Sequence, residues 1–224
     1  DDFWHTMSRF HELPPSPISL LESLRNLGYS METAIADIID NSISAEADEI
    51  NIDFSWNDGD PWLAITDNGC GMTHADLVNA MRFGSVSPFA IRSSNDMGRF
   101  GLGLKTASLS QCRHLTVLSK KEGTVSCCEW DLNRIAHIGE DVWNLGILES
   151  DDIVQRDVLW SIYQRVLEHV ASGTIVVWEH IDRISEKNAG SGQDAYFNAQ
   201  IDDTRNHLQL VFHRFLSPEE VGRK

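Results

Sequence analysis

The chain has 224 residues, of which 42% are hydrophobic, enough to bury a sizeable core in one domain. Lys and Arg number 18 against 34 Asp and Glu, so the formal charge of −16 excludes a strongly basic face for nucleic acid or an anionic membrane as a bulk property. No apolar run approaches the roughly 20 residues that span a bilayer, and the four cysteines form no C-x-x-C pair. We therefore expect a reduced intracellular, cytoplasmic protein that does not enter membranes.

The first third of the chain predicts an arm, two helices and a β-hairpin. Residues 1–17 end in a proline-rich run that cannot donate regular backbone hydrogen bonds, which indicates an extended arm. Leucines at helical spacing continue to Gly28, and Ser30 is a suitable N-cap for a second, longer helix. Apolar and polar residues alternate over 49–56, and an Asn-Asp-Gly-Asp turn leads into a second strand over 62–66.

The remaining elements are shorter and mixed in type. Thr73, with Asp76 three residues later, predicts the start of a short helix. A loop rich in Gly, Ser, Pro and Asn follows over 84–98. We then expect helices at 102–111, about 155–170 and about 194–216, and strands at 114–119, 124–130 and 174–180.

This order of elements predicts the fold class. Helices and hairpin-connected strands come in runs, without the regular βαβ alternation of a doubly wound parallel sheet. We therefore expect an α+β two-layer sandwich, with a mixed, mostly antiparallel sheet and helices on one face. The last helix presents an apolar stripe of Phe197, Ile201, Leu208, Val211, Phe212 and Phe215.

The second helix carries the first candidate site. Asp37 and Asn41 are four residues apart, so their side chains leave the same face of the helix. The amide oxygen of Asn41 suits Mg²⁺, which takes one or two protein oxygens besides substrate phosphates. Asp37 could then orient or deprotonate an attacking water. On its own, the pattern favours an amphipathic core helix with solvated carboxylates over a binding site.

A second candidate site is the run Asp67-Asn68-Gly69-Cys70-Gly71-Met72, at the end of an apolar strand. The carboxylate of Asp67 can accept a hydrogen bond from the amino group of adenine. Gly69 and Gly71 would let the backbone pass close beneath a base, where a Cβ atom would collide with it. An ordinary strand-to-helix turn is the alternative for this run alone.

The third candidate site is a glycine-rich segment that begins at Gly98. It is not a Walker A loop, because Leu104 stands where that motif needs Lys, nor a dinucleotide fingerprint, because Thr106 replaces the third glycine. What remains is a glycine loop that leads into a helix whose free N–H groups can hold phosphate oxygens. The loop before it, from Gly84 to Gly98, is expected to close over a nucleotide as a lid. The candidate binding residues here are Gly98, Gly101, Leu102, Gly103, Leu104, Lys105 and Thr106.

Taken together and in this order, the three segments resemble the N box, the adenine motif and the lid motif of the ATPase superfamily that unites gyrase, heat-shock chaperones, histidine kinases and MutL (GHKL). Gly173-Thr174 resembles a fourth element, and the motif pattern is most similar to MORC-type ATPases and their prokaryotic relatives, with MutL next. The resemblance implies a Bergerat-type ATP-binding domain over residues 18–224, with ATP and Mg²⁺ as ligands. Its implied site comprises Asp37 as the catalytic residue, Asn41 as the metal ligand, and Asp67, Gly69, Gly71, Met72, Thr174 and the lid residues given above.

Two residues depart from the superfamily pattern. Asp37 stands where Glu is usual, and Ser44 stands where relatives often carry Asp. Three functions stay open: a Mg²⁺-dependent ATPase that closes a dimeric clamp, a nucleotide-operated switch with little turnover, and a histidine-type protein kinase. Asp37 and Asp40 argue against the kinase, whose N box lacks the carboxylate base. The resemblance also implies an ATP-dependent homodimer, DNA reached through other domains, and a following transducer domain that this chain lacks.

Overall fold

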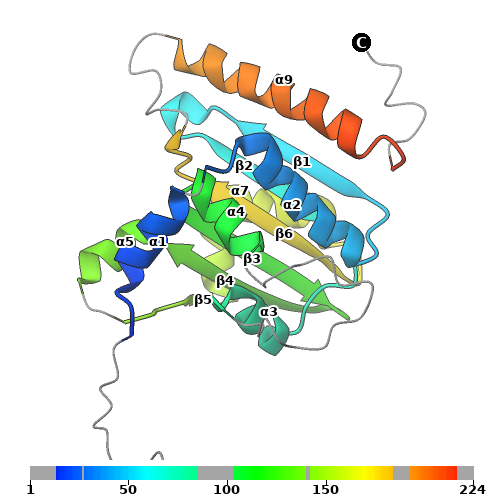
Figure 1. Ribbon diagram of the computed structural model, residues 1–224. Helices are drawn as coiled ribbons and strands as arrows, with labels where there is room; N and C mark the ends of the chain where they lie inside the picture. The colour runs from blue at the N-terminus through cyan, green and yellow to red at the C-terminus, as the bar shows by residue number, and fades with distance from the viewer. Residues whose placement is uncertain (1–13, 27, 85–102, 140–141, 184–191, 216–224) are drawn as a thin grey trace, which may run out of the picture.

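Six strands form one antiparallel sheet in the computed structural model, which describes residues 14–26, 28–84, 103–139, 142–183 and 192–215. Their spatial order is β1-β2-β6-β3-β4-β5, and every neighbouring pair is antiparallel (Figure 1). The α+β class is therefore confirmed. The strands are β1 (Ile50–Ser55), β2 (Trp62–Asp67), β3 (His114–Lys121), β4 (Thr124–Asp131), β5 (Gly146–Leu148) and β6 (Gly173–Glu179).

One face of the sheet is covered by helices that lie in front of it in Figure 1. They are α1 (Pro17–Arg25), α2 (Met31–Ser44), α3 (His74–Met81), α4 (Gly103–Gln111) and α9 (Gln193–Val211), with α5 (Leu132–Ile138) at the rim. The helical spacing of Ile35, Ile38 and Ile39 turns one side of α2 into the core, where it meets Ile65 and Trp178 of the sheet. Residues of all three predicted motif segments lie in or against this front core: Ile38 and Ile39, Met72, and Leu104.

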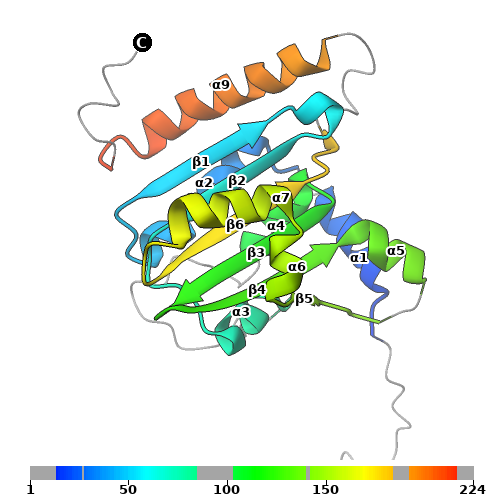
Figure 2. The same cartoon turned by 180° about the vertical axis from the view of Figure 1, so that it is seen from behind.

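The opposite face is covered as well, by α6 (Ser150–Val154), α7 (Asp157–Ile162) and the π-helical turn η3 (Tyr163–Leu167), as Figure 2 shows. A second core forms there from Leu118 and Ile175 of the sheet and from Leu159, Ile162 and Leu167. The prediction that helices lie on one face was therefore wrong. Because β6 carries four consecutive apolar residues, Ile175 to Trp178, which point alternately to its two faces, both faces need cover.

The helix caps, the short elements and the last helix agree with the predictions to different degrees. The capping box at Thr73 is confirmed, with Asp76 as its partner. Ser30 does precede α2, but its hydroxyl lies 2.9 Å from the Thr33 hydroxyl and does not bond the helix backbone. The sequence did not predict α5 or β5. On α9 the predicted stripe is only partly buried, because Val211 is 50% and Phe215 67% exposed.

Several predictions fall outside what the structure describes. They concern residues 1–13 of the predicted arm, the predicted loop after Gly84, and the candidate site residues Gly98, Gly101 and Leu102. Among the described helices, none combines the length and the apolar character needed to cross a bilayer.

Candidate functional site

Three neighbouring strands bring polar side chains level with one another. Asp67 on β2 is the register partner of Thr174 on β6, and Thr174 is also the partner of Ser119 on β3. The Ser119 Oγ accepts a hydrogen bond from the Met72 N–H at 2.8 Å and lies 3.1 Å from the Thr174 Oγ1. One buried hydroxyl thus connects the adenine motif with the Gly173-Thr174 segment.

The Asp67 carboxylate is the buried anchor of this site, with 6% of the residue exposed. Its Oδ2 accepts a hydrogen bond from the Ser42 hydroxyl at 2.8 Å, and its Oδ1 accepts one from the Gly69 N–H at 3.0 Å. Burial raises the pKa of Asp67, although the hydrogen bonds from Gly69, Ser42 and the Thr174 backbone oppose that rise. The carboxylate therefore joins α2 to the adenine motif.

Both glycines of the adenine motif are required by close approach within the protein. A Cβ at Gly71, which has φ +62°, would lie 2.0 Å from the carbonyl oxygen of Lys120. A Cβ at Gly69 would lie 2.8 Å from the carbonyl oxygen of Ala45. The predicted steric reason was a collision with a base, whereas the collisions found here are with backbone. Both glycines therefore allow the backbone itself to fold into this turn, whether or not a ligand is bound.

A cavity of about 420 Å³ opens between α2, the adenine motif and the start of α4. Ile38, Val117 and Val176 give it apolar walls. Predicted site residues from all four sequence segments line it: Asn41, Asp67, Gly71, Met72, Gly103, Leu104, Lys105 and Thr174. Of the other candidates, Gly69 and Thr106 lie beside this lining without forming part of it, and Gly98, Gly101 and Leu102 are outside the described residues.

Asn41 and Asp37 lie on successive turns of α2 but in different surroundings. Asn41 is exposed and borders the cavity, whereas Asp37 is half-buried and does not line it. Burial, and then the charge of the nearby Asp37 carboxylate, raises the pKa of Tyr29. Burial, and then the charge of Asp37, also raises the pKa of Asp40. The helix thus presents two interacting carboxylates next to one free amide.

The donor set around Asn41 suits a cation that is shared with a ligand. Within the described residues no group of three or more His, Cys, Asp or Glu side chains could hold a metal ion. A single amide oxygen facing an open cavity fits Mg²⁺, which keeps waters and takes most of its other ligands from substrate phosphates. A structural zinc site, which needs four protein ligands, does not fit these residues.

Lys105 lines the cavity, yet its ammonium is turned to the protein. It donates a hydrogen bond to the Ala80 carbonyl near the end of α3 and lies 5.8 Å from the centroid of the Phe83 ring. A cation is favourable at the C-terminus of a helix, but burial still lowers the pKa of Lys105 to about 8. Next to it on α4, the buried hydroxyls of Thr106 and Ser108 bond no described residue.

Ser42 and Ser119 are the residues that sequence reasoning missed. Ser42 stands in the N box without an assigned role, and Ser119 was read only as the end of a strand. The available signal was a polar residue at a position that the apolar pattern would bury. Their partners could not be foreseen, because these depend on how α2 and β3 are placed against Asp67 and Thr174.

The fold and the cavity define a GHKL-type ATP-binding domain: an antiparallel sheet whose front carries an asparagine-bearing helix, an Asp-x-Gly-x-Gly turn and a glycine-led helix. Residues 29–159, more than half of the chain, match the family described as "Histidine kinase-, DNA gyrase B-, and HSP90-like ATPase". The chain belongs to this family.

Curated relatives match a shorter stretch. ATPase morc-1 of Caenorhabditis elegans is 32% identical over 94 residues, which cover 42% of this chain and 11% of that protein. ATPase MORC2B of Mus musculus is 36% identical over 97 residues (42% and 9%), and the DNA mismatch repair protein MutL of Thermoanaerobacter sp. strain X514 is 32% identical over 95 residues (41% and 15%). The match therefore spans between 9 and 15% of the lengths of these relatives.

Proposed function

We propose that this domain binds ATP with Mg²⁺ in the cavity between α2, the adenine motif and α4. The observation that supports it best is that segments far apart in the chain line one cavity, with a buried carboxylate and an exposed amide among its walls. Asp67 and Asn41 are those two groups. Membership of the ATPase family agrees with this arrangement.

The adenine would lie against Asp67. A carboxylate held by Ser42 and Gly69 cannot turn away, so it offers a fixed acceptor to the amino group of the base. The apolar walls from Ile38 and Val176 would contact the faces of the ring. Thr174 lies beside Asp67 and can add a hydroxyl, directly or through a water.

The phosphates would extend toward Asn41 and the first turn of α4. The amide oxygen of Asn41 would hold Mg²⁺, and bound Mg²⁺ neutralises charge on the phosphates. The N–H groups at Gly103 and Leu104 begin the helix and can donate to phosphate oxygens. Lys105 would add its charge after leaving the Ala80 carbonyl.

Hydrolysis would use Asp37, one turn before Asn41. Its carboxylate would orient a water and accept a proton from it, and the nearby Tyr29 hydroxyl would help to position the carboxylate. The aspartate side chain is one methylene shorter than the usual glutamate, which favours a second candidate function: a nucleotide-operated switch with little turnover. Asp37→Glu should raise turnover if reach is limiting, and an unchanged or lower rate would count against that explanation.

Nucleotide binding would drive a larger change in the full protein. MORC and MutL relatives suggest a dimeric clamp that closes on ATP and reopens after hydrolysis, with DNA as a target. At a charge of −16, this domain would add little DNA affinity, so other domains would supply it.

Calorimetry with a non-hydrolysable ATP analogue tests the proposal. We expect saturable binding that weakens by about tenfold or more when Mg²⁺ is chelated, and similarly in Asn41→Ala, because each removes a link between the protein and the phosphates. Asn206→Ala, an exposed change on α9, is the matched control and should bind as the wild type does. Absence of saturable binding, or equal affinity in Asn41→Ala and the control, would contradict the proposal.

A further inference from the structure

The outer edge of β1 carries backbone groups that bond no other described residue. β1 is the first strand of the sheet order, and within the described residues no other strand pairs with its outer side. The Asn68 N–H donates to the Glu49 carbonyl at 3.3 Å, and antiparallel strands alternate bonded and non-bonded positions. The N–H and C=O groups of Ile50, Ile52 and Phe54 therefore point away from β2.

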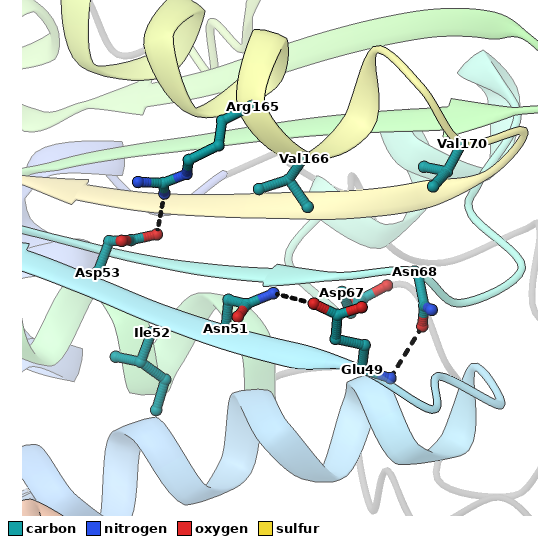
Figure 3. Close-up of a pocket in the computed structure, with 9 residues that line it drawn as sticks. All are labelled: Glu49, Asn51, Ile52, Asp53, Asp67, Asn68, Arg165, Val166 and Val170. Carbon is teal, nitrogen blue, oxygen red and sulfur yellow. Dashed lines mark hydrogen bonds and ion pairs between the residues drawn. The ribbon is translucent and has the colours of Figure 1, made fainter.

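A second cavity of about 500 Å³ lies along this edge, on the face opposite the front core. Figure 3 shows it between β1 and the π-helical turn above it, with Val166 pointing across the gap. The Ile52 side chain points to α2 and packs on the front core, so the backbone of Ile52 borders the cavity. The cavity is lined by Glu49, Asn51, Ile52, Asp53, Asp67, Asn68, Arg165, Val166 and Val170.

The charge along this edge is negative. Arg165 pairs with Asp53, and the Asp67 carboxylate bonds Ser42 of α2, which leaves Glu49 as the carboxylate that a ligand in the cavity can meet. Glu49 is exposed, its Oε1 accepts a hydrogen bond from the Asn51 amide at 3.0 Å, and its Oε2 meets no described partner. Asp48 lies next to it and bonds Asn68. A positively charged group would complement Glu49.

We propose that the outer edge of β1 binds an extended, basic segment of a partner protein, which adds to the sheet as a further strand. The exposed N–H and C=O groups would supply main-chain hydrogen bonds, and alternate side chains of the segment would enter the cavity. A Lys or Arg among them would meet Glu49, and an apolar neighbour on the same face would meet Val166 and Val170.

The same charges argue against a second copy of this chain as the occupant. Two β1 edges brought together would place Glu49 and Asp53 of one copy against carboxylates of the other, and like charges across a strand pair are destabilising. Acidic side chains on an edge strand prevent pairing between copies. They select a basic partner for the same reason.

Fluorescence anisotropy with labelled ten-residue peptides tests this site. A peptide that carries lysine and valine in turn on one set of alternate residues, with threonine between them, should bind the wild-type domain, because its lysines and valines then lie on one face of the strand. Replacing its lysines by glutamates should abolish binding. N-methylation removes backbone donors, so methylating one of the two sets of alternate residues should weaken binding at least roughly tenfold, while the other set leaves it unchanged. Because this comparison uses the wild-type domain, it does not depend on how any variant folds.

Protein variants locate the site on β1. Glu49→Lys should lower the affinity for the lysine peptide at least about tenfold. Asp151→Lys makes the same change of charge at an exposed position of α6 and should lower the affinity much less. Equal effects of the two variants would show attraction to overall charge and overturn the proposal. So would equal binding by the two methylated peptides, or no saturable binding at millimolar peptide.

Discussion

The two ends of the proposed nucleotide cavity, the adenine end at Asp67 and the phosphate end at Asn41 and Lys105, are built differently. At the adenine end, Asp67 is fixed by hydrogen bonds from Ser42 and Gly69, and Thr174 lies against Ser119. At the phosphate end, Asn41 is exposed and the Lys105 ammonium bonds the Ala80 carbonyl. The first end is organised by the sheet without a ligand, whereas under the proposed function the phosphates would complete the second.

The largest expected difference in stability is between alanine substitutions of two glycines, Gly71 at the adenine end and Gly103 at the phosphate end. Gly71→Ala places a Cβ 2.0 Å from the Lys120 carbonyl oxygen at a φ of +62°, so we expect it to cost about 4 kcal/mol or more of the free energy of unfolding. Gly103→Ala meets no atom within 4 Å and begins a helix, so its effect should stay within about 1 kcal/mol and be stabilising. Urea denaturation measures both. Similar losses in the two variants would contradict the contrast.

Lys105 gives the phosphate end a dependence on pH. Burial lowers its pKa in the folded state to about 8, against an ordinary value of 10.5. Between these two pH values the unfolded chain therefore binds more protons than the folded protein. The free energy of unfolding should therefore rise with pH in this window, by at most about 1.4 kcal/mol per pH unit from this group. Lys105→Met removes the contribution. Parallel stability curves for the wild type and this variant from pH 8 to 10.5 would show that the side chain is solvated.

Ser119→Ala tests the adenine end at a smaller scale. The change leaves the Met72 N–H without its acceptor, which should cost about 1–3 kcal/mol of stability. Ser161→Ala removes an exposed hydroxyl that bonds only the Val158 carbonyl, and we expect a change within about 0.5 kcal/mol. Chemical denaturation distinguishes the two. Equal, small effects would mean that water replaces the Ser119 hydroxyl.

The smallest effect is expected at Asn41. Because its side chain is exposed, Asn41→Ala should change the free energy of unfolding by no more than about 0.5 kcal/mol. Its loss of nucleotide affinity would then reflect binding and not folding. A thermal unfolding midpoint well below that of the wild type, without ligand, would show that Asn41 supports the structure instead.

The fold could be predicted from local patterns but its layering could not. Helical and alternating spacing located α2 and the β1–β2 hairpin closely, because each pattern depends only on neighbouring residues. The position of α7 on the second face depends on Leu118 and Ile175, whose strands lie side by side only in the sheet. β5 has three residues, too few for a pattern.

The candidate site shows the same division. Spacing on one helix predicted that Asp37 and Asn41 share a face, but not that Asp37 would lie near Tyr29 and that Asn41 would line the cavity without it. The role of Ser119 depends on strand register, and the burial of Lys105 depends on Phe83 and Ala80 beside it. These relations arise from packing between segments that are distant in sequence.

The most direct test of the adenine end compares ATP and GTP analogues by calorimetry in the wild type and in Asp67→Asn. A fixed carboxylate accepts a hydrogen bond from the amino group of adenine but repels the carbonyl of guanine, so the wild type should prefer the ATP analogue by about 100-fold or more. Asp67→Asn should lose most of that preference, because an amide can donate to the carbonyl as well as accept. A wild-type domain that binds both analogues equally, or a variant that keeps the full preference, would contradict adenine recognition by Asp67.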